Sequence, residues 1–533
     1  MSELVTIPDE VPFPPRYWWL KRIAFAYALL FVALLILRLW WGHVAHNRLE
    51  AEIAKYKTAG EPIEPEDFDP KVVLPDEDNA ASLLMEAANA LSLNDHEMQL
   101  CRKLDGDSLH WREHREEFGS LVNRARSALE LVRRSRTLTK VDWGIRFRTP
   151  VSATMLPHLA PARWLAAVAS AAVYALHEEQ RDGEAIEGLL DILHLSRCLD
   201  QDPGGYSHLS AGRIAETAGR TLEGIFADLR VGRSFHRSIG SNPIADEVQL
   251  RVLMECFLDD SRARNAMVER MWLRRAMALD VGRQLTGGCP PSQVINTTSV
   301  LVIPRPIALL KTLSAPIVPM YELDTLRSFR FIARQIEASA QNDYPAAFRM
   351  EPSGADLPAP TSPLAFARPV NAFLGTIPEP GFPAHFRVLA IRRMAAIALA
   401  IRLYEIDYDE TPLRLRELIP EFLPQMPSDP FSPDSSEFHF RYDHENTLLY
   451  SVGRDGVDDE GRETVLSRDR YTVSRGDIVF YLDRSRVGRD PASSPEAAND
   501  QSNIHDTERE TDDGEPGDDE PESRDSDPDD RRP

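Results

Sequence analysis

The chain has 533 residues and a formal net charge of −23, and 43% of its residues are hydrophobic. That length accommodates two or three domains with a sizeable core, while the negative charge excludes a protein built to bind nucleic acid, whose phosphates attract Lys and Arg. No Cys-x-x-Cys pair occurs, which excludes zinc ribbons, thioredoxin-type redox motifs and covalent haem attachment. The four cysteines are expected to be small buried side chains, or to pair as disulfides if the region is exported: Cys101, Cys198, Cys256 and Cys289.

An uncharged apolar stretch near the N-terminus predicts a transmembrane helix over residues 22–42. Its centre, Ile23–Leu37, reads IAFAYALLFVALLIL, and with its flanks it is long enough to cross about 30 Å of hydrocarbon. Trp pairs lie at both ends, as is typical of membrane interfaces, and no small-residue cleavage site follows. We therefore expect an uncleaved, single-pass anchor. The short segment 1–21 is expected to stay in the cytoplasm and the bulk of the chain to lie outside it.

Residues 43–79 are expected to leave the membrane as a helix and to continue as an acidic linker. The segment HVAHNRLEAEIAKYK prolongs the helical pattern, and Gly60 and Pro62 then interrupt it. His43 and His46 lie close together on this helix. We interpret them as an interfacial pair, because a metal site would need further ligands nearby.

Residues 80–345 show the three-to-four spacing of apolar side chains that predicts a helical domain. Long helices joined by tight turns favour an antiparallel helix array, and no fixed repeat length supports a repeat family. The expected helices cover residues 79–93, 161–180, 184–199, 208–229 and 245–285. Eight prolines from Pro352 to Pro383 then predict a Pro-rich linker over 346–384.

Two groups of candidate catalytic or metal-binding residues lie within the helical domain. His110 and His114 are four residues apart and share a helix face, which suits a metal; a solvated, charged face is the preferred interpretation. Ser207, His208 and Ser210 lie together, but neighbouring residues on a helix point apart and no partner acid is identifiable, so we interpret this segment as a helix start. No His-Glu-x-x-His, Walker, Gly-x-Ser-x-Gly or dinucleotide-binding motif occurs.

The C-terminal part, residues 385–483, predicts a small α+β domain. A helix is expected first, with Ala390, Met394 and Ile397 on its apolar face. Alternation with a period of two then predicts three strands near 438–442, 448–452 and 477–482, which form an antiparallel sheet against that helix. The final segment, 484–533, has few apolar side chains, and from Pro491 onward it carries sixteen acidic and four basic residues. This composition predicts a disordered acidic tail.

The order of motifs in 385–483 resembles the globular lobe of the major, G-type pseudopilins of type II secretion. The matching residues are Tyr404, Asp407, Pro427, Asp429, Pro430, Tyr450–Gly456, Asp477 and Ile478. The resemblance implies that the loop YSVGRDG binds calcium through Asp455 and Asp477, with Asp458 or Asp459 as a further carboxylate. No prepilin-peptidase site precedes the apolar stretch, and Phe-Ser replaces the family's Trp-Gly after Asp429-Pro430. Assembly into a pilus-like fibre is therefore not expected.

The residues of this loop also offer the chemistry of a cation site by themselves. Calcium takes six to eight oxygen ligands in flexible geometry, and the candidate metal ligands are Asp455, Asp458, Asp459 and Asp477. Their spacing is not that of an EF-hand. The alternative is a pair of Asp-rich turns whose carboxylates accept hydrogen bonds from local N–H groups. Both interpretations fit the sequence.

Together these features predict a mainly α-helical protein with an N-terminal transmembrane helix, a helical array, a small α+β domain and an acidic tail. This plan resembles that of bacterial proteins with a single span in the inner (cytoplasmic) membrane. We expect a non-catalytic scaffold whose helical domain binds a protein partner, with calcium as its one cofactor if the acidic loop is a cation site rather than a pair of turns. The alternative is a membrane-anchored, hydrolase-type enzyme, which a polar pocket at His110, His114 or His208 would favour.

Overall fold

The computed structural model describes residues 17–483 apart from Val73, 105–107, Pro203, 233–243, 288–317, 352–367, 377–380, 434–435, 443–446 and 465–474. The chain divides into one compact unit, Met1–Asp483, and a second unit, Arg484–Pro533. The predicted acidic tail and Cys289 lie outside the described residues. Cys101, Cys198 and Cys256 are free thiols, and the first two are buried.

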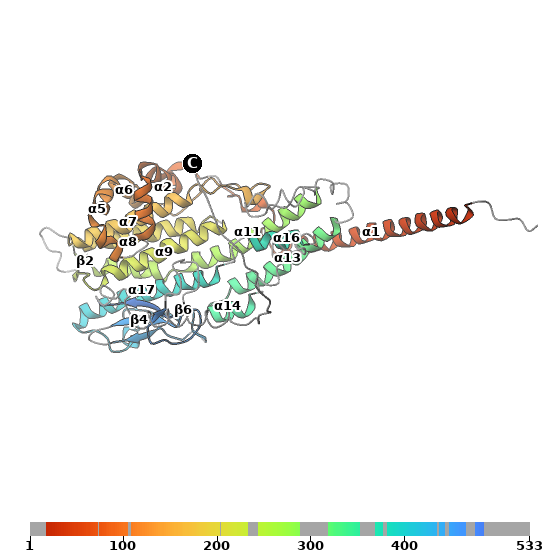
Figure 1. Ribbon diagram of the computed structural model, residues 1–533. Coiled ribbons are helices and arrows are strands. Elements are labelled where there is room, and N and C mark those ends of the chain that lie inside the picture. The colour runs from red at the N-terminus through yellow and green to blue at the C-terminus, as the bar shows by residue number, and fades with distance from the viewer. Residues whose placement is uncertain are drawn as a thin grey trace, which may run out of the picture. The chain divides into compact units, whose positions relative to one another are not determined.

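The first unit is mainly helical, as predicted, with short strands near its C-terminal end (Figure 1). The α-helices are α1 Trp18–Thr58, α2 Ala80–Ala90, α3 Asp95–Leu104, α4 Ser108–Glu113, α5 Arg115–Arg124, α6 Arg126–Ser135, α7 Leu159–Glu178, α8 Asp182–Leu199, α9 Gly205–Phe226, α10 Glu247–Leu258, α11 Ser261–Thr286, α13 Val318–Ser339, α14 Tyr344–Met350, α16 Pro369–Thr376 and α17 Phe382–Tyr408. The 3-10 helices are η1 Pro65–Phe68, η2 Asp76–Asp78, η3 Val151–Ala153 and η7 Leu415–Leu418. The strands are β1 Val231–Gly232, β2 Ala245–Asp246, β3 His439–Arg441, β4 Leu448–Ser451, β5 Glu463–Thr464, β6 Arg475–Gly476 and β7 Ile478–Tyr481.

Helix α1 has two parts with opposite surroundings. Its N-terminal part is apolar and exposed, and the helix is long and apolar enough to cross a membrane. Its C-terminal part packs on α13 and buries Ala45, Leu49, Ile53 and Tyr56. Helix α7 also has the length and composition of a membrane span, but most of its apolar stretch is buried in the unit, as expected of a core helix.

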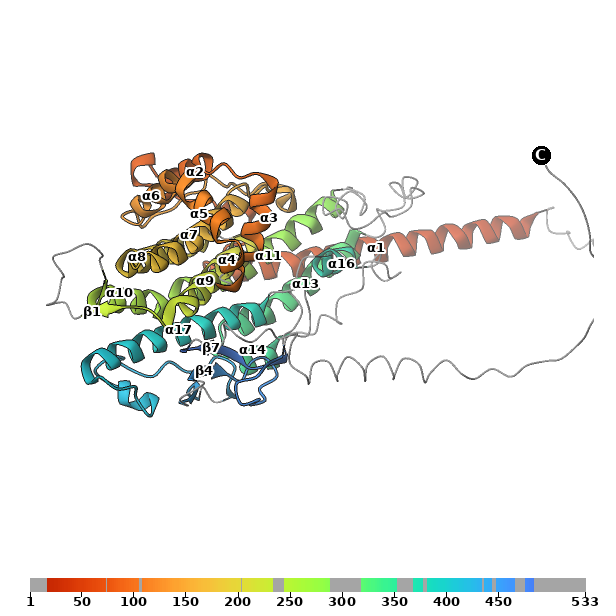
Figure 2. The same ribbon diagram turned by 60° about the vertical axis from the view of Figure 1, so that its left-hand side comes forward.

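Helices α7, α8 and α9 pack against one another around an Ala-rich core. Small side chains let these helices approach closely: a Cβ at Gly188 of α8 would lie 2.7 Å from Cγ2 of Val173 on α7. Helix α17 packs on α9 and α10 on one side and on β4 and β7 on the other, and both views show it between those helices and the strands (Figures 1 and 2). The helices before residue 346 and α17 therefore share one hydrophobic core.

The structure corrects one predicted helix. The helix expected over 245–285 is two helices, α10 and α11, which are separated at Asp259 and Asp260. The guanidinium of Arg392 on α17 donates to the carbonyl oxygens of Phe257, Cys256 and Asp259 at 3.1, 2.9 and 2.6 Å. The break is stable because a buried cation satisfies the carbonyls at the end of α10.

Helix α16 lies inside the segment expected as a Pro-rich linker, residues 346–384, and α14 extends into its start. Helix α16 buries Val370, Phe373 and Leu374 completely. Asp324 of α13 accepts hydrogen bonds from the N–H groups of Val370 and Asn371 at 2.8 and 3.2 Å. A buried carboxylate from another helix therefore satisfies the first turn of α16.

The predicted antiparallel sheet of three strands is confirmed, with the order β3-β4-β7. In the β4–β7 pair, Leu449 lies opposite Phe480 and Tyr450 lies opposite Val479. Leu449 and Phe480 belong to the main core, while Tyr450 and Val479 form a second cluster with Leu448 on the other face. The sheet is thus buried on both faces at its centre, and its alternation separates the two clusters.

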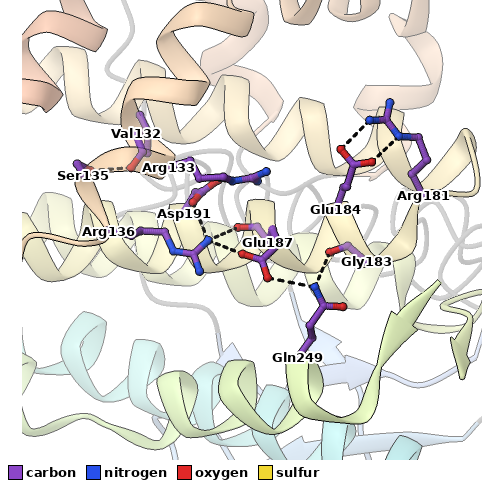
Figure 3. A network of polar contacts seen from close by, with 10 residues as sticks. All are labelled: Val132, Arg133, Ser135, Arg136, Arg181, Gly183, Glu184, Glu187, Asp191 and Gln249. Atoms are coloured by element: carbon purple, nitrogen blue, oxygen red, sulfur yellow. Dashed lines mark hydrogen bonds and ion pairs between the residues drawn. The ribbon is translucent and has the colours of Figure 1, made fainter. Parts of the chain in front are cut away.

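A polar network joins α6, α8 and α10 (Figure 3). Asp191 of α8 accepts hydrogen bonds from Arg133 and Arg136 of α6 at 2.8 and 3.0 Å. Arg136 also pairs with Glu187 at 2.7 Å, and Gln249 of α10 donates to the same carboxylate group at 3.1 Å. The side chain of Asp191 is 6% exposed, so a buried carboxylate joins partly exposed side chains of the three helices.

Candidate functional site

The acidic loop, residues Gly453–Gly461, leaves the sheet after β4 and returns beside the start of β7. Strands β5 and β6 pair after it, which brings Asp477, the residue between β6 and β7, next to the loop. Gly453 has φ +65°, and a Cβ at this position would lie 2.3 Å from the carbonyl oxygen of Gly476. Only glycine fits this close approach of the two chain segments.

Two of the four predicted metal ligands form local turns. Asp455 accepts a hydrogen bond from the N–H of Val457 at 3.3 Å, and its second oxygen accepts one from Gly476 at 3.2 Å. Asp458 accepts a hydrogen bond from the N–H of Glu460 at 2.9 Å. Both patterns are the Asx turns of the alternative interpretation.

Asp477 differs from Asp455 and Asp458, because one of its two carboxylate oxygens is buried without a hydrogen-bond donor in the described part of the chain. Its Oδ2 accepts a hydrogen bond from the N–H of Gly461 at 2.6 Å. Its Oδ1 is buried and accepts no hydrogen bond from the residues that the structure describes, and the residue is 3% exposed. Burial, with the charges of Asp458 and Asp459, raises the pKa of Asp477 to about 6, against the opposing effect of nearby N–H groups.

A carboxylate in this environment favours a bound proton or a bound cation. Asp455 and Asp458 are exposed and Asp459 is half-buried, so the loop carboxylates are open to solvent on one side. The described carboxylates do not converge as a ready-made ligand group; calcium would draw them together with backbone carbonyl oxygens, which its flexible coordination permits.

A second polar cluster, the α8–α9 cluster, lies at the turn between α8 and α9. Its members are Asp200, Asp202, Ser207 and His208, with His158 and His385 packed against them; all six are buried. His208 Nδ1 lies 2.8 Å from Asp200, and its Nε2 lies 3.3 Å from Nδ1 of His385. The hydroxyl of Ser207 donates to Asp202 at 2.6 Å, and Nε2 of His158 lies 3.1 Å from the same carboxylate.

This cluster supplies the partner acids that sequence reasoning missed for Ser207 and His208. The signal was local: Asp200 and Asp202 precede the helix start by a few residues, where carboxylates commonly bond to the first turn of a helix. His158 and His385 come from distant segments, and no local pattern indicates them. Burial and the neighbouring charges of His208 and Arg264 hold the pKa of His385 well below its ordinary value, so this imidazole is neutral.

The geometry of the α8–α9 cluster suits structural support better than nucleophilic catalysis. In a serine hydrolase the hydroxyl donates to an imidazole, which removes its proton. Here the Ser207 hydroxyl donates to a carboxylate instead, and Ser207 is fully buried. The cluster therefore joins the ends of α8 and α9 to α7 and α17.

The structure brings the predicted pair His110 and His114 together, with ring centroids 4.6 Å apart. The pair His43 and His46 has separate partners: His43 bonds to Asn47 at 2.9 Å and His46 to Glu322 of α13 at 3.1 Å. The latter contact joins α1 to α13.

No protein-family model, no curated protein and no solved structure matches this chain.

Proposed function

We propose that this chain is a single-pass, membrane-anchored, non-catalytic scaffold that holds its helical body at a membrane surface and binds a protein partner there. The observation that carries the proposal is the division of α1. One continuous helix is exposed over its uncharged apolar stretch, Ile23–Leu37, and then packs one face on the body by burying Ala45, Leu49, Ile53 and Tyr56. A flexible linker would allow the body to move away from the membrane; a shared helix holds it at a fixed distance.

The membrane in this proposal is the bacterial inner membrane, with the body outside the cytoplasm. An extracytoplasmic location supplies the calcium that the acidic loop would bind, and weak calcium sites are useful there. Exposed apolar side chains such as Tyr408, the last residue of α17, and Leu413, which follows it, offer contacts to a partner. The interior positions of Ser207 and His208 support a body that is built for binding rather than catalysis.

The location is tested by expressing the full chain in a bacterium and washing the membranes at alkaline pH. The full chain is expected to stay in the membrane, and a chain that lacks residues 18–41 is expected to be released. Protease added to spheroplasts is expected to degrade the body of the full chain. Release of the full chain by the wash, or complete protection of the body in intact spheroplasts, would overturn the proposed location.

Partner binding is tested with a photoreactive amino acid in place of Leu413, and in place of exposed Glu77 as the control. A discrete cross-linked product that forms in membranes from position 413 and not from position 77 is expected. Equal products from both positions, or none from either, would count against a specific partner at this surface.

The calcium part of the proposal is tested by calorimetric titration of the full chain in detergent. The full chain is the right material, because α17 shares its core with the preceding helices. Saturable calcium binding is expected in the wild type and in the control E77A/D78A, whose acids are exposed. The variant D455A/D477A is expected to lose it. Equal binding by D455A/D477A would reduce the loop to a pair of turns.

A second candidate function, a membrane-anchored hydrolase, is favoured by one observation: the α8–α9 cluster pairs two imidazoles with carboxylates around a serine. A fluorophosphonate probe distinguishes the candidates. Under the scaffold proposal neither the wild type nor S207A is labelled. Labelling of the wild type that S207A abolishes would establish the enzyme and refute the scaffold.

A further inference from the structure

Three metal-ligating side chains meet at the junction of α4 and α5. His110 lies within α4, Glu113 is its last residue, and His114 lies between the two helices. Each residue places one ligand atom within 4.8 Å of those of the other two. Among the residues that the structure describes, no other three His, Cys, Asp or Glu side chains come together in this way.

The backbone at this junction is held in place by buried neighbours. The N–H of His114 donates to the carbonyl oxygens of His110 and Trp111 at 3.3 and 3.2 Å, so the chain keeps its turn between the two helices. Trp111 is buried, stacks on Tyr174 of α7 and donates from Nε1 to Glu178. The ring of His110 packs edge-on against buried Phe118. The two imidazoles therefore come from a supported segment, as a metal site requires.

A carboxylate already orients one of these imidazoles. Glu117 bonds to Nδ1 of His114 at 3.0 Å, and its second oxygen bonds to Nε2 of His96 on α3 at 2.6 Å. Histidines that bind metals almost always give their other ring N–H to a carboxylate, a backbone carbonyl or water. With Nδ1 of His114 engaged in this way, its Nε2 is the nitrogen left for a metal.

We propose that His110, Glu113 and His114 bind a zinc ion, and that Glu117 is the residue that positions His114. Two imidazoles and one carboxylate suit zinc and exclude calcium, which prefers oxygen ligands alone. Three protein ligands leave a fourth position for water. This zinc site does not depend on the calcium loop or on the proposed scaffold role.

The test is a titration of the metal-free, tag-free full chain in detergent with Co²⁺, which reports zinc-like sites by colour. One Co²⁺ per chain is expected, with the strong visible absorption of tetrahedral coordination, and Zn²⁺ is expected to abolish that absorption. Cobalt held by oxygen ligands alone, as in an acidic loop, is only weakly coloured and would be distinguished by its spectrum.

Four variants make the result specific. H110A/H114A is expected to lose the coloured complex, and the control H43A/H46A, a histidine pair elsewhere, is expected to keep it. Because Glu113 is exposed, E113Q should fold normally and weaken Co²⁺ binding at least about tenfold. E117Q should weaken it about 10- to 100-fold, the range for residues that orient metal ligands. An absence of tetrahedral Co²⁺ in the wild type, or wild-type affinity in H110A/H114A or in E113Q, would overturn the site.

Discussion

At the scale of single residues, Asp477 predicts a specific pH dependence. Its pKa in the folded chain is about 6, above the value of about 4 in an unfolded chain. The folded state therefore binds more protons than the unfolded state between these values, and the free energy of unfolding falls as the pH rises from about 4 to about 6. D477N removes this contribution. In chelator at pH 7, D477N is expected to be about 1 kcal/mol more stable than the wild type, since solvent screens the neighbouring Asp458 and Asp459.

Urea unfolding at several pH values checks this prediction, with the difference between wild type and D477N as the readout. Other carboxylates titrate in the same range, but they contribute to both proteins. Saturating calcium is expected to stabilise the wild type at pH 7 and to leave D477N unchanged, because a bound cation replaces the proton on the carboxylate. A difference that does not vary between pH 4 and pH 7 would contradict the assigned environment of Asp477.

The α8–α9 cluster gives a second prediction, from a matched pair of serines. Ser207 is fully buried and donates to Asp202 at 2.6 Å, whereas Ser82 donates to Asp76 at 3.2 Å on the surface. S207A leaves a buried carboxylate with one fewer donor and is expected to cost about 1–3 kcal/mol. S82A, also in the first turn of a helix, is expected to cost less than about 0.5 kcal/mol.

Chemical denaturation of both serine variants measures the difference. Equal stability of S207A and S82A would show that the α8–α9 cluster does not support the fold.

At the residue scale, the sequence was sufficient to predict the turns of the acidic loop but not the environment of Asp477. The paired glycines and acids of the acidic loop indicated turns, and Asp455 and Asp458 form them. The unusual environment of Asp477 depends on the pairing of β5 with β6, which are two residues long and have no recognisable pattern of their own.

At the scale of helices and strands, the network of Figure 3 predicts unequal effects of two acids on α8. Asp191 accepts from Arg133 and Arg136 in a side-chain position that is 6% exposed. Glu184 pairs with Arg181 at the surface, where both side chains are more than a third exposed. D191A removes the shared partner of two arginines and is expected to cost about 2–3 kcal/mol, while E184A is expected to cost less than about 1 kcal/mol.

Thermal unfolding of both acid variants checks this comparison, with helix content followed by circular dichroism. If D191A were no less stable than E184A, the network would contribute little to the packing of α6 on α8.

The presence of the helices was predicted well, because the three-to-four spacing of their apolar side chains is a strong pattern. What surrounds each helix was not predicted. Helix α17 was expected to have one apolar face, yet nearly every residue from Val388 to Leu399 is buried. It lies between other helices and the sheet, and a helix that is covered all round needs apolar side chains all round. The break between α10 and α11 was missed for a similar reason, since it depends on Arg392, a residue far away in the sequence.

At the scale of the whole unit, α1 consists of an exposed apolar stretch and a second part that packs on the folded body. The body should need only this second part of α1 in order to fold. The ring of Tyr56 packs against Phe329 of α13 and lies 3.9 Å from the guanidinium of Arg275, which in turn pairs with Glu61 at 2.6 Å. These contacts all come after Gly42. A chain that begins at residue 43 should therefore remain folded, and one that begins at residue 61 should not.

Two alanine variants test the same division of α1 in the full-length chain. Ile53 is 2% exposed and Leu35 is 46% exposed, although both lie on the same continuous helix. I53A opens a cavity between α1 and the body and is expected to cost about 2–4 kcal/mol in urea unfolding of the detergent-solubilised chain. L35A removes an exposed side chain outside the folded body and is expected to change this stability by less than about 0.5 kcal/mol. Equal losses of stability in both variants would mean that the apolar stretch also packs on the body. No loss in I53A would mean that α1 only tethers the body. A large loss in I53A with little change in L35A requires that the second part of α1 belongs to the core and the first part does not.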